Sequence, residues 1–189
     1  MVDLYWIPLG AGGHSVRLTG LAYAAISGRD IYHAALIVDG HAIEVAPVWA
    51  GDDAMVASGA VGSRLLGRWS LFRYGVCCRR DGTIPDLAEA VGGPHRVSSD
   101  PAAAHRILDA IATVPRPVWG RDELAAGEMW TSNSVVAWLL ATAGLPAARL
   151  HPPPRGCAPG WRAGLVAASS VSDSTAPRVQ ARRTSTAAG

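Results

Sequence analysis

The sequence contains no lysine, a single phenylalanine and only three cysteines among its 189 residues. Because all 17 basic residues are arginine, the chain cannot use a lysine as a Schiff base, as a general base or in a phosphate-binding Gly-Lys-Ser/Thr loop. Cys77 and Cys78 are adjacent and Cys157 is distant, which fits neither a disulfide framework nor a CxxC metal site. We therefore expect reduced thiols, a cytoplasmic location, and no metal ion or organic cofactor.

The main part of the chain has no excess of charge. The formal net charge is +2 at pH 7, and three arginines against Asp173 within residues 169–189 account for it. A neutral body without a basic face predicts no nucleic-acid partner. The longest apolar run, residues 135–145, is much shorter than the roughly 20 residues that span a bilayer, and no basic segment precedes an apolar stretch at the N-terminus. We expect no membrane span and no targeting segment.

The composition predicts one packed domain followed by a tail. Hydrophobic residues make up 49% of the chain and the mean hydropathy is +0.17, which is too apolar for a chain that is disordered throughout. No hydrophobic period continues beyond Ala168, where the composition becomes rich in Ser, Thr, Ala and Arg. We therefore expect a domain over residues 1–168 and a disordered tail over residues 169–189.

Within that domain the pattern predicts a small antiparallel sheet packed against helices, which is the α+β class. Strands are expected at residues 2–9, 31–38, 41–46 and 69–79, with Asp39-Gly40 as a hairpin turn. A glycine-rich turn at residues 10–15 leads into a helix at 16–27. Further helices are expected at 84–91, at 101–113 after the N-cap Asp100, and from Thr131 or Ser132 to Gly144.

The glycine-rich turn and the scattered histidines do not indicate a cofactor site. The run Gly-Ala-Gly-Gly-His-Ser at 10–15 is half of a dinucleotide fingerprint, but it ends in serine and the next strand leads into a hairpin instead of a helix. His95, His105 and His151 are isolated, with no spacing typical of a metal site.

A histidine and a carboxylate are expected close together on the hairpin. With a two-residue turn, His33 and Glu44 lie on the same face as diagonal neighbours, roughly 7–8 Å apart between backbone positions. A carboxylate that accepts a hydrogen bond from one ring nitrogen fixes the tautomer and leaves the other nitrogen free to act as a base.

Ser132 stands at the start of the most apolar predicted helix. A hydroxyl in the first turn of a helix lies near unpaired backbone N–H groups and the positive end of the helix dipole, which can stabilise an oxyanion. Serine and threonine are also the commonest N-cap residues, and simple capping is the more frequent reason for a serine at such a position.

These two segments, residues 30–47 and 127–144, resemble the circularly permuted papain-like hydrolases, the NlpC-type and lecithin-retinol acyltransferase-like group. The resemblance implies a papain-like fold in which His33 is the base, Glu44 is the third polar residue, and Ser132 occupies the position where the family usually has cysteine. The chain also resembles a group of actinobacterial proteins without an assigned activity, in keeping with its arginine-only, alanine-rich composition.

The resemblance implies a hydrolase or acyltransferase that acts on an amide or ester of a small molecule or peptide. Ser132, His33 and Glu44 would form the triad, and backbone N–H groups near Ser132 and Asn133 would hold the oxyanion; the alternative role of Asn133 is to order the helix start. Trp130, and Trp119 or Trp161 in predicted loops, are candidates for lining an apolar cleft, although tryptophans in loops also commonly pack the loops against a small core. Serine depends on a well-placed base more than cysteine does. The alternative is therefore an inactive papain-like domain that binds a peptide or lipid. No residue pattern indicates the oligomeric state.

Overall fold

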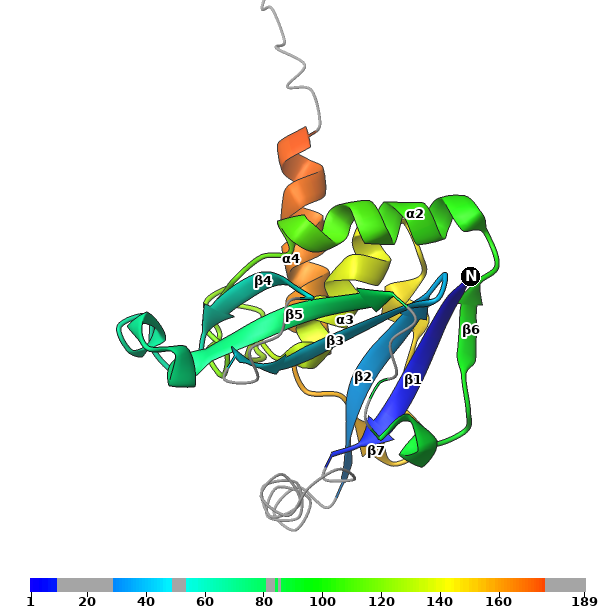
Figure 1. Ribbon diagram of the computed structural model, residues 1–189, viewed down its shortest axis with the longest axis horizontal. Helices are drawn as coiled ribbons and strands as arrows, with labels where there is room; N and C mark the ends of the chain where they lie inside the picture. Colours follow the sequence, from blue (N-terminus) through cyan, green and yellow to red (C-terminus); the bar gives the residue numbers. More distant parts are fainter. Residues whose placement is uncertain (10–28, 49–53, 81–83, 85, 176–189) are drawn as a thin grey trace, which may run out of the picture.

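The computed structural model describes residues 1–9, 29–48, 54–80, 84 and 86–175 (Figure 1). The described strands are β1 (Val2–Pro8), β2 (Asp30–Val38), β3 (His41–Pro47), β4 (Met55–Ala60), β5 (Arg73–Arg80), β6 (His95–Ser98) and β7 (Gly156–Cys157). The described α-helices are α2 (Pro101–Ala110), α3 (Ser132–Thr142) and α4 (Trp161–Thr175). Short 3-10 helices are η2 (Leu66–Arg68), η3 (Ser70–Phe72), η4 (Leu87–Glu89), η5 (Ile111–Thr113) and η6 (Ala147–Arg149).

The strands form one sheet in the order β4-β5-β3-β2-β1-β6, in which all neighbours along this path are antiparallel. The two-residue strand β7 pairs in parallel with the start of β2. An antiparallel sheet packed against helices confirms the α+β class.

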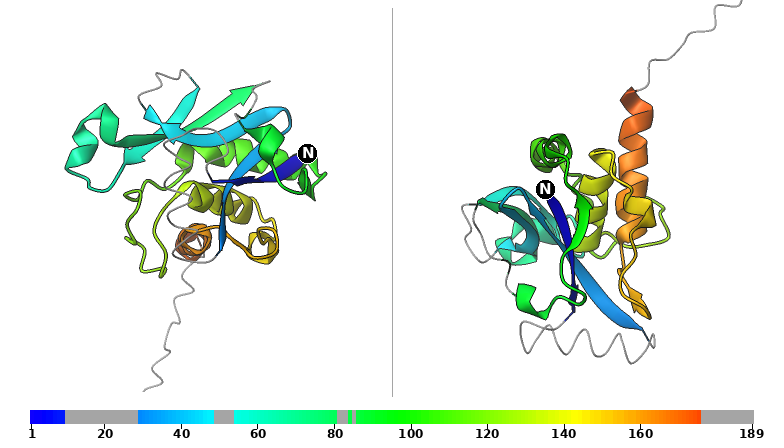
Figure 2. Two further views of the ribbon diagram at one scale, coloured as in Figure 1. Left: turned by 90° about the horizontal axis from the view of Figure 1, so that it is seen from below. Right: turned by 90° about the vertical axis from the view of Figure 1, so that its right-hand side faces the viewer.

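The helices lie on one face of the sheet, and α3 is the middle layer (Figure 2). Helix α3 contacts β2 and β3 on one side and α4 on the other, while α2 lies across α3 and β2. Residues 132–140 of α3 are all buried, which explains why this helix is apolar on every side. At Gly164 the two helices approach so closely that a Cβ would collide with the Ser134 carbonyl oxygen.

The predicted hairpin is present, but its two strands separate soon after the turn. Asp39 and Gly40 have φ of 50° and 78°, the left-handed values that a tight two-residue hairpin turn requires. Val38 pairs with His41 as predicted, and the β2–β3 ladder ends at Leu36 opposite Ile43. From there β3 follows β5 and β2 follows β1, so the two strands diverge (Figure 1). The edge of β2 that faces β3 is therefore not paired with β3 over the residues that precede Leu36.

Two predicted elements differ from the structure, and the structure also has short strands that were not predicted. The strand expected at 69–79 begins only at Arg73, because residues 70–72 form η3. In the segment expected to be helical at 84–91, the described residues form only η4, which Asp86 precedes in the left-handed region at φ 64°. The short strands β4 and β6 were not predicted, because neither Met-Val-Ala-Ser-Gly-Ala nor His-Arg-Val-Ser shows a strong alternation of apolar and polar residues.

The boundary predicted at residue 168 does not coincide with the end of an element. Helix α4 continues to Thr175, and the Ser169 and Ser170 hydroxyls donate to the carbonyls of Leu165 and Val166 one turn earlier. The predicted turn and helix at 10–27, and residues 176–189 of the predicted tail, lie outside the described residues. Within the described part of the chain, none of the helices combines the length and apolarity needed to cross a membrane.

Candidate functional site

The structure brings Ser132 and His33 into direct contact across 99 residues of sequence. Ser132 is the first residue of α3, His33 lies in β2, and the Ser132 Oγ is 2.8 Å from the His33 Nδ1. In the neutral ring with its proton on Nε2, Nδ1 accepts the hydrogen bond from the hydroxyl. This is the hydrogen-bonded arrangement of a nucleophile and a general base.

The side chain of Asn133 fixes this contact by taking the place of a strand at the free edge of β2. Its Oδ1 accepts from the Ala34 N–H at 2.8 Å, and its Nδ2 donates to the Tyr32 carbonyl at 3.0 Å. These two backbone groups flank His33, so one carboxamide holds the residues on both sides of the base. Nδ2 also donates to the Pro159 carbonyl at 3.0 Å. Asn133 is 4% exposed, so these bonds are shielded from water.

A capping box holds the start of α3. Thr131 is the N-cap: its hydroxyl accepts from the Asn133 N–H at 3.2 Å and donates to the Pro159 carbonyl at 2.7 Å. The Ser134 hydroxyl accepts from the Thr131 N–H at 2.9 Å and donates to the Gly160 carbonyl at 2.7 Å. Ser132 is therefore not the capping residue, and its hydroxyl is left for His33.

The same hydrogen bonds decide which donors remain for an oxyanion. The sequence predicts that N–H groups near both Ser132 and Asn133 hold the oxyanion. The Asn133 N–H is already bound to the Thr131 hydroxyl and the Asn133 carboxamide to β2, so neither is available for an oxyanion. The Ser132 N–H has no hydrogen-bond partner in the described part of the chain. It lies at the positive end of the α3 dipole, where negative charge is favoured.

Ser132 and His33 line a cavity of about 240 Å³ whose surface is mainly apolar. The other lining residues include Ile31, Tyr32, Trp119, Met129 and Pro159. Ser132 is only 8% exposed, so a reacting group must enter this cavity to reach the hydroxyl. The cavity is suited to a small apolar acyl or aromatic group.

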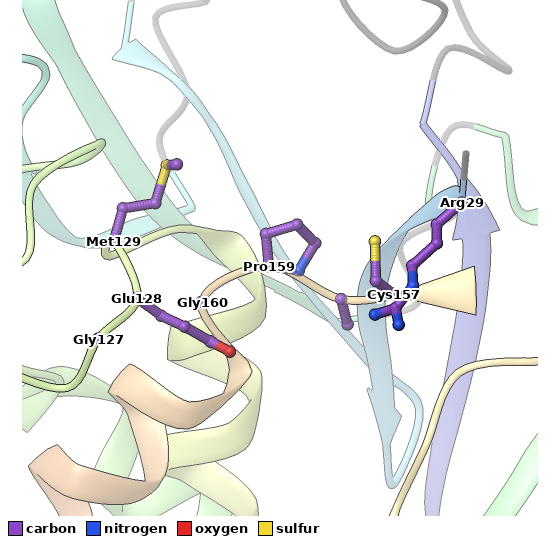
Figure 3. Close-up of a pocket in the computed structure, with 8 residues that line it drawn as sticks. Arg29, Gly127, Glu128, Met129, Cys157, Pro159 and Gly160 are labelled. Carbon is purple, nitrogen blue, oxygen red and sulfur yellow. The ribbon is translucent and has the colours of Figure 1, made fainter. Parts of the chain in front are cut away.

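A second, larger cavity adjoins the first and is more polar. It has a volume of about 570 Å³ and shares Met129 and Pro159 with the Ser132 cavity. Figure 3 shows Glu128 on one side of it and Arg29 with Cys157 on the other. The polar part of a ligand whose apolar part lies beside Ser132 would therefore extend toward charged side chains.

Burial keeps the His33 ring neutral. Desolvation lowers the pKa of His33 from 6.5 to about 4, and the negative charge of Asp86 opposes this shift. A neutral ring has a free nitrogen to accept the Ser132 proton at pH 7. The low pKa also makes the ring a weak base, so we expect its reaction to be slow.

The His33 shift predicts how stability depends on pH. Between pH 6.5 and about 4 the unfolded chain binds a proton at His33 that the folded chain does not, so the free energy of unfolding falls as the pH falls through this range. The loss attributable to His33 is about 3 kcal/mol. Urea denaturation near pH 7 and near pH 4 measures it. His33→Gln should lose less stability than the wild type on acidification, and an equal loss in both proteins would contradict the assignment.

Glu44 does not contact His33, which corrects the predicted triad. Its carboxylate forms an ion pair with Arg79 of β5. His33 and Glu44 are not diagonal neighbours, because the pairing of β2 with β3 ends at Leu36 and Ile43, before it reaches either residue. In the described part of the chain, the charge that acts on His33 is Asp86, two residues after Ile84, which packs in one cluster with Ala35 of β2.

Trp130 also differs from its predicted role, because it is 1% exposed and belongs to the hydrophobic core. The tryptophan in the wall of the Ser132 cavity is Trp119, which the sequence also offered as a candidate, and its backbone forms a bridge to Trp130. The sequence did not predict that the Asn133 side chain holds β2 through hydrogen bonds to the backbone of Ala34 and Tyr32. One signal was available: Asn133 is the only asparagine in the chain.

The cysteines offer no competing nucleophile. All three are free thiols, and Cys77 and Cys78 lie in β5 as expected. Burial raises the pKa of each of the three, so the reactive thiolate is scarce at neutral pH. Among the described residues, no group of three or more His, Cys, Asp or Glu side chains is arranged to hold a metal ion.

No protein-family model, curated protein or solved structure matches this chain. The function is therefore inferred from the geometry of the site.

Proposed function

We propose that this protein is a hydrolase or acyltransferase that acts on an ester or amide through Ser132 and His33. The observation that carries the proposal is the 2.8 Å contact between the Ser132 hydroxyl and a neutral imidazole, at a helix N-terminus and in the wall of an apolar cavity. The pair replaces the Ser-His-Glu triad expected from the sequence, because Glu44 is bound to Arg79.

The proposed reaction begins with transfer of the Ser132 proton to the His33 Nδ1 as Oγ attacks the substrate carbonyl carbon. The carbonyl oxygen becomes an oxyanion, which the Ser132 N–H and the helix dipole stabilise. His33 then gives its proton to the leaving alcohol or amine as the carbonyl bond to it breaks, leaving an acyl-serine. Water, activated by the same imidazole, releases the acid; an alcohol or amine in its place makes the reaction an acyl transfer.

A permuted papain-like arrangement is the fold we propose for this chemistry. Its support is the placement of the base on an early strand of an antiparallel sheet, and of the nucleophile at the start of a later helix that packs against this sheet. The two hydrogen bonds from the Asn133 side chain to the backbone of β2 hold the start of the helix next to the strand.

The cavity limits the substrates that we propose. An acyl group in contact with Ser132 would lie among apolar side chains, whereas the leaving group would extend toward the polar cavity between Glu128 and Arg29. Short esters of small molecules fit this division, and no organic cofactor or metal ion takes part in the proposed steps.

Turnover of p-nitrophenyl acetate and butyrate tests the proposal. We expect slow hydrolysis, with an acyl adduct on the wild type detected by intact-mass spectrometry, and a loss of about 10³-fold or more in Ser132→Ala. Ser99→Ala, which removes an exposed hydroxyl elsewhere, should behave as the wild type. A folded wild type that forms no adduct but binds an apolar peptide or lipid would favour the binding module instead.

A further inference from the structure

An arm of the molecule, residues 61–72 between β4 and β5, carries a group of exposed apolar side chains. Figure 1 shows it projecting from the body of the molecule, beyond the ends of β4 and β5. Leu65, Trp69 and Leu71 are 61%, 58% and 62% exposed, and Leu66 is also exposed. So many large apolar side chains on one short segment exceed the scattered apolar residues of an ordinary surface and indicate an interaction site.

The arm is folded, so these side chains are held outward. Its backbone closes with a hydrogen bond from the Val61 N–H to the Phe72 carbonyl at 2.8 Å, and it contains η2 and η3. At its base, Arg73 of β5 donates to the Gly67 carbonyl of the arm at 3.0 Å and to the Ser58 hydroxyl of β4. Backbone groups of the arm are therefore hydrogen-bonded within the molecule, while its large apolar side chains remain exposed.

The arm belongs to the most basic part of the described chain. Residues 54–80 contain five arginines and no carboxylate. Of the three arginines at the arm, Arg64 is paired with Glu123, Arg73 binds neutral oxygens, and Arg68 is exposed beside Trp69. An anionic surface is therefore the partner whose charge complements the arm.

We propose that residues 61–72 dock on the surface of a bilayer that contains anionic phospholipids. Tryptophan and leucine side chains at a convex tip can enter the headgroup and upper acyl region while arginine contacts the phosphates. The inference does not depend on the reaction proposed for Ser132.

The position of the arm gives this docking a consequence for the site. The Gly62 N–H donates to the Trp119 carbonyl at 2.9 Å, and a cavity of about 270 Å³ at the base of the arm is lined by Leu71, Tyr74 and Trp119 among others. Trp119 also lines the Ser132 cavity. Trp119 is therefore shared by the cavity at the base of the arm and the Ser132 cavity.

Co-sedimentation with vesicles tests the proposal on the full chain. We expect binding to vesicles of phosphatidylcholine mixed with phosphatidylglycerol, and much weaker binding to phosphatidylcholine alone. Trp69→Ser and Leu71→Ser should each weaken binding about tenfold or more, and Arg68→Glu should do so only with the anionic vesicles. Val91→Ser and Arg149→Glu, at an exposed valine and an exposed arginine outside the arm, should bind as the wild type.

A second measurement locates the contact. Brominated phospholipids should quench part of the tryptophan fluorescence of the wild type, and Trp69→Phe should bind vesicles while losing that part of the quenching. Circular dichroism checks that each variant folds. Equal sedimentation of the wild type and the Trp69 and Leu71 serine variants would overturn the proposal. The proposal would also be overturned if the wild type did not bind vesicles and instead formed a dimer that these variants dissociate. The arm would then be an interface between two copies.

Discussion

Replacement of His33 by alanine is expected to slow the labelling of Ser132 by a fluorophosphonate probe about 10²–10⁴-fold at pH 7. The probe is attacked by an activated serine Oγ, which displaces fluoride from phosphorus. In the wild type the neutral His33 ring, 2.8 Å from this oxygen, accepts the proton as the bond forms. Without the ring, the hydroxyl has no base within hydrogen-bond distance among the described residues.

The labelling rate is measured from the increase of the adduct with time. His105→Ala is the matched control, because His105 is an exposed histidine of α2, away from the site. It should label at the wild-type rate. Lowering the pH should leave the wild-type rate nearly constant until the pH approaches 4, where His33 becomes protonated. Equal labelling rates in the wild type and His33→Ala would show that His33 is not the base.

Replacement of Asn133 by aspartate is expected to lower the free energy of unfolding by about 3–5 kcal/mol at pH 7. The change keeps the shape of the side chain but puts a carboxylate oxygen where Nδ2 donates to the Tyr32 and Pro159 carbonyls. The Tyr32 carbonyl loses its donor, the Pro159 carbonyl keeps only the hydrogen bond from the Thr131 hydroxyl, and a buried negative charge faces both. Because this side chain also positions His33, the variant should lose labelling at Ser132 even under conditions in which it is folded.

Urea denaturation measures the loss, and Ser132→Ala is the comparison at the neighbouring position. Ser132→Ala removes one hydrogen bond to His33, so its loss should be only about 1 kcal/mol. The defect of Asn133→Asp should diminish at acidic pH, since a protonated carboxyl group can again donate one hydrogen bond. If Asn133→Asp had the same free energy of unfolding as the wild type, the hydrogen bonds of the Asn133 side chain would contribute little to stability.

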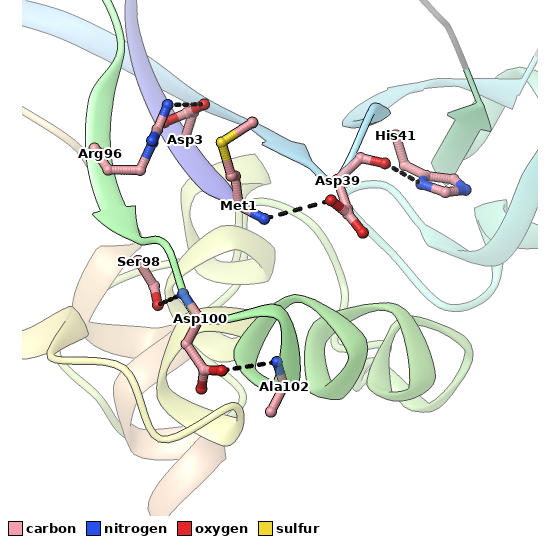
Figure 4. Close-up of polar contacts among 8 residues, drawn as sticks. All are labelled: Met1, Asp3, Asp39, His41, Arg96, Ser98, Asp100 and Ala102. Atoms are coloured by element: carbon pink, nitrogen blue, oxygen red, sulfur yellow. Dashed lines mark hydrogen bonds and ion pairs between the residues drawn. The ribbon is translucent and has the colours of Figure 1, made fainter.

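Local chemistry made some elements predictable from the sequence. Asp39-Gly40 produced the expected turn, and Asp100 caps α2 through a hydrogen bond from the Ala102 N–H at 2.9 Å (Figure 4). In the same way, the start of α3 follows from Thr131 and Ser132. Each of these signals acts within a few residues and does not depend on the rest of the fold.

The site was predictable only in part because it depends on contacts distant in sequence. Ser132 and His33 were identified by residue type and by their places at a helix start and a strand. Glu44 was assigned on the assumption that the hairpin ladder continues, whereas β3 leaves β2 after Ile43. The edge that this exposes is occupied by the Asn133 side chain. The partners of the two diverging strands, β1 for β2 and β5 for β3, lie outside the hairpin, as does Asn133.

Whether Ser132 is a nucleophile activated by His33 is tested by locating the fluorophosphonate adduct on the wild-type protein with peptide mapping and tandem mass spectrometry. We expect an adduct on the Ser132 hydroxyl and none on Ser134, whose hydroxyl is buried and bound to the Gly160 carbonyl. A folded wild-type protein that stays unlabelled, or that carries the adduct on a different residue, would contradict the assignment of Ser132 as a nucleophile activated by His33.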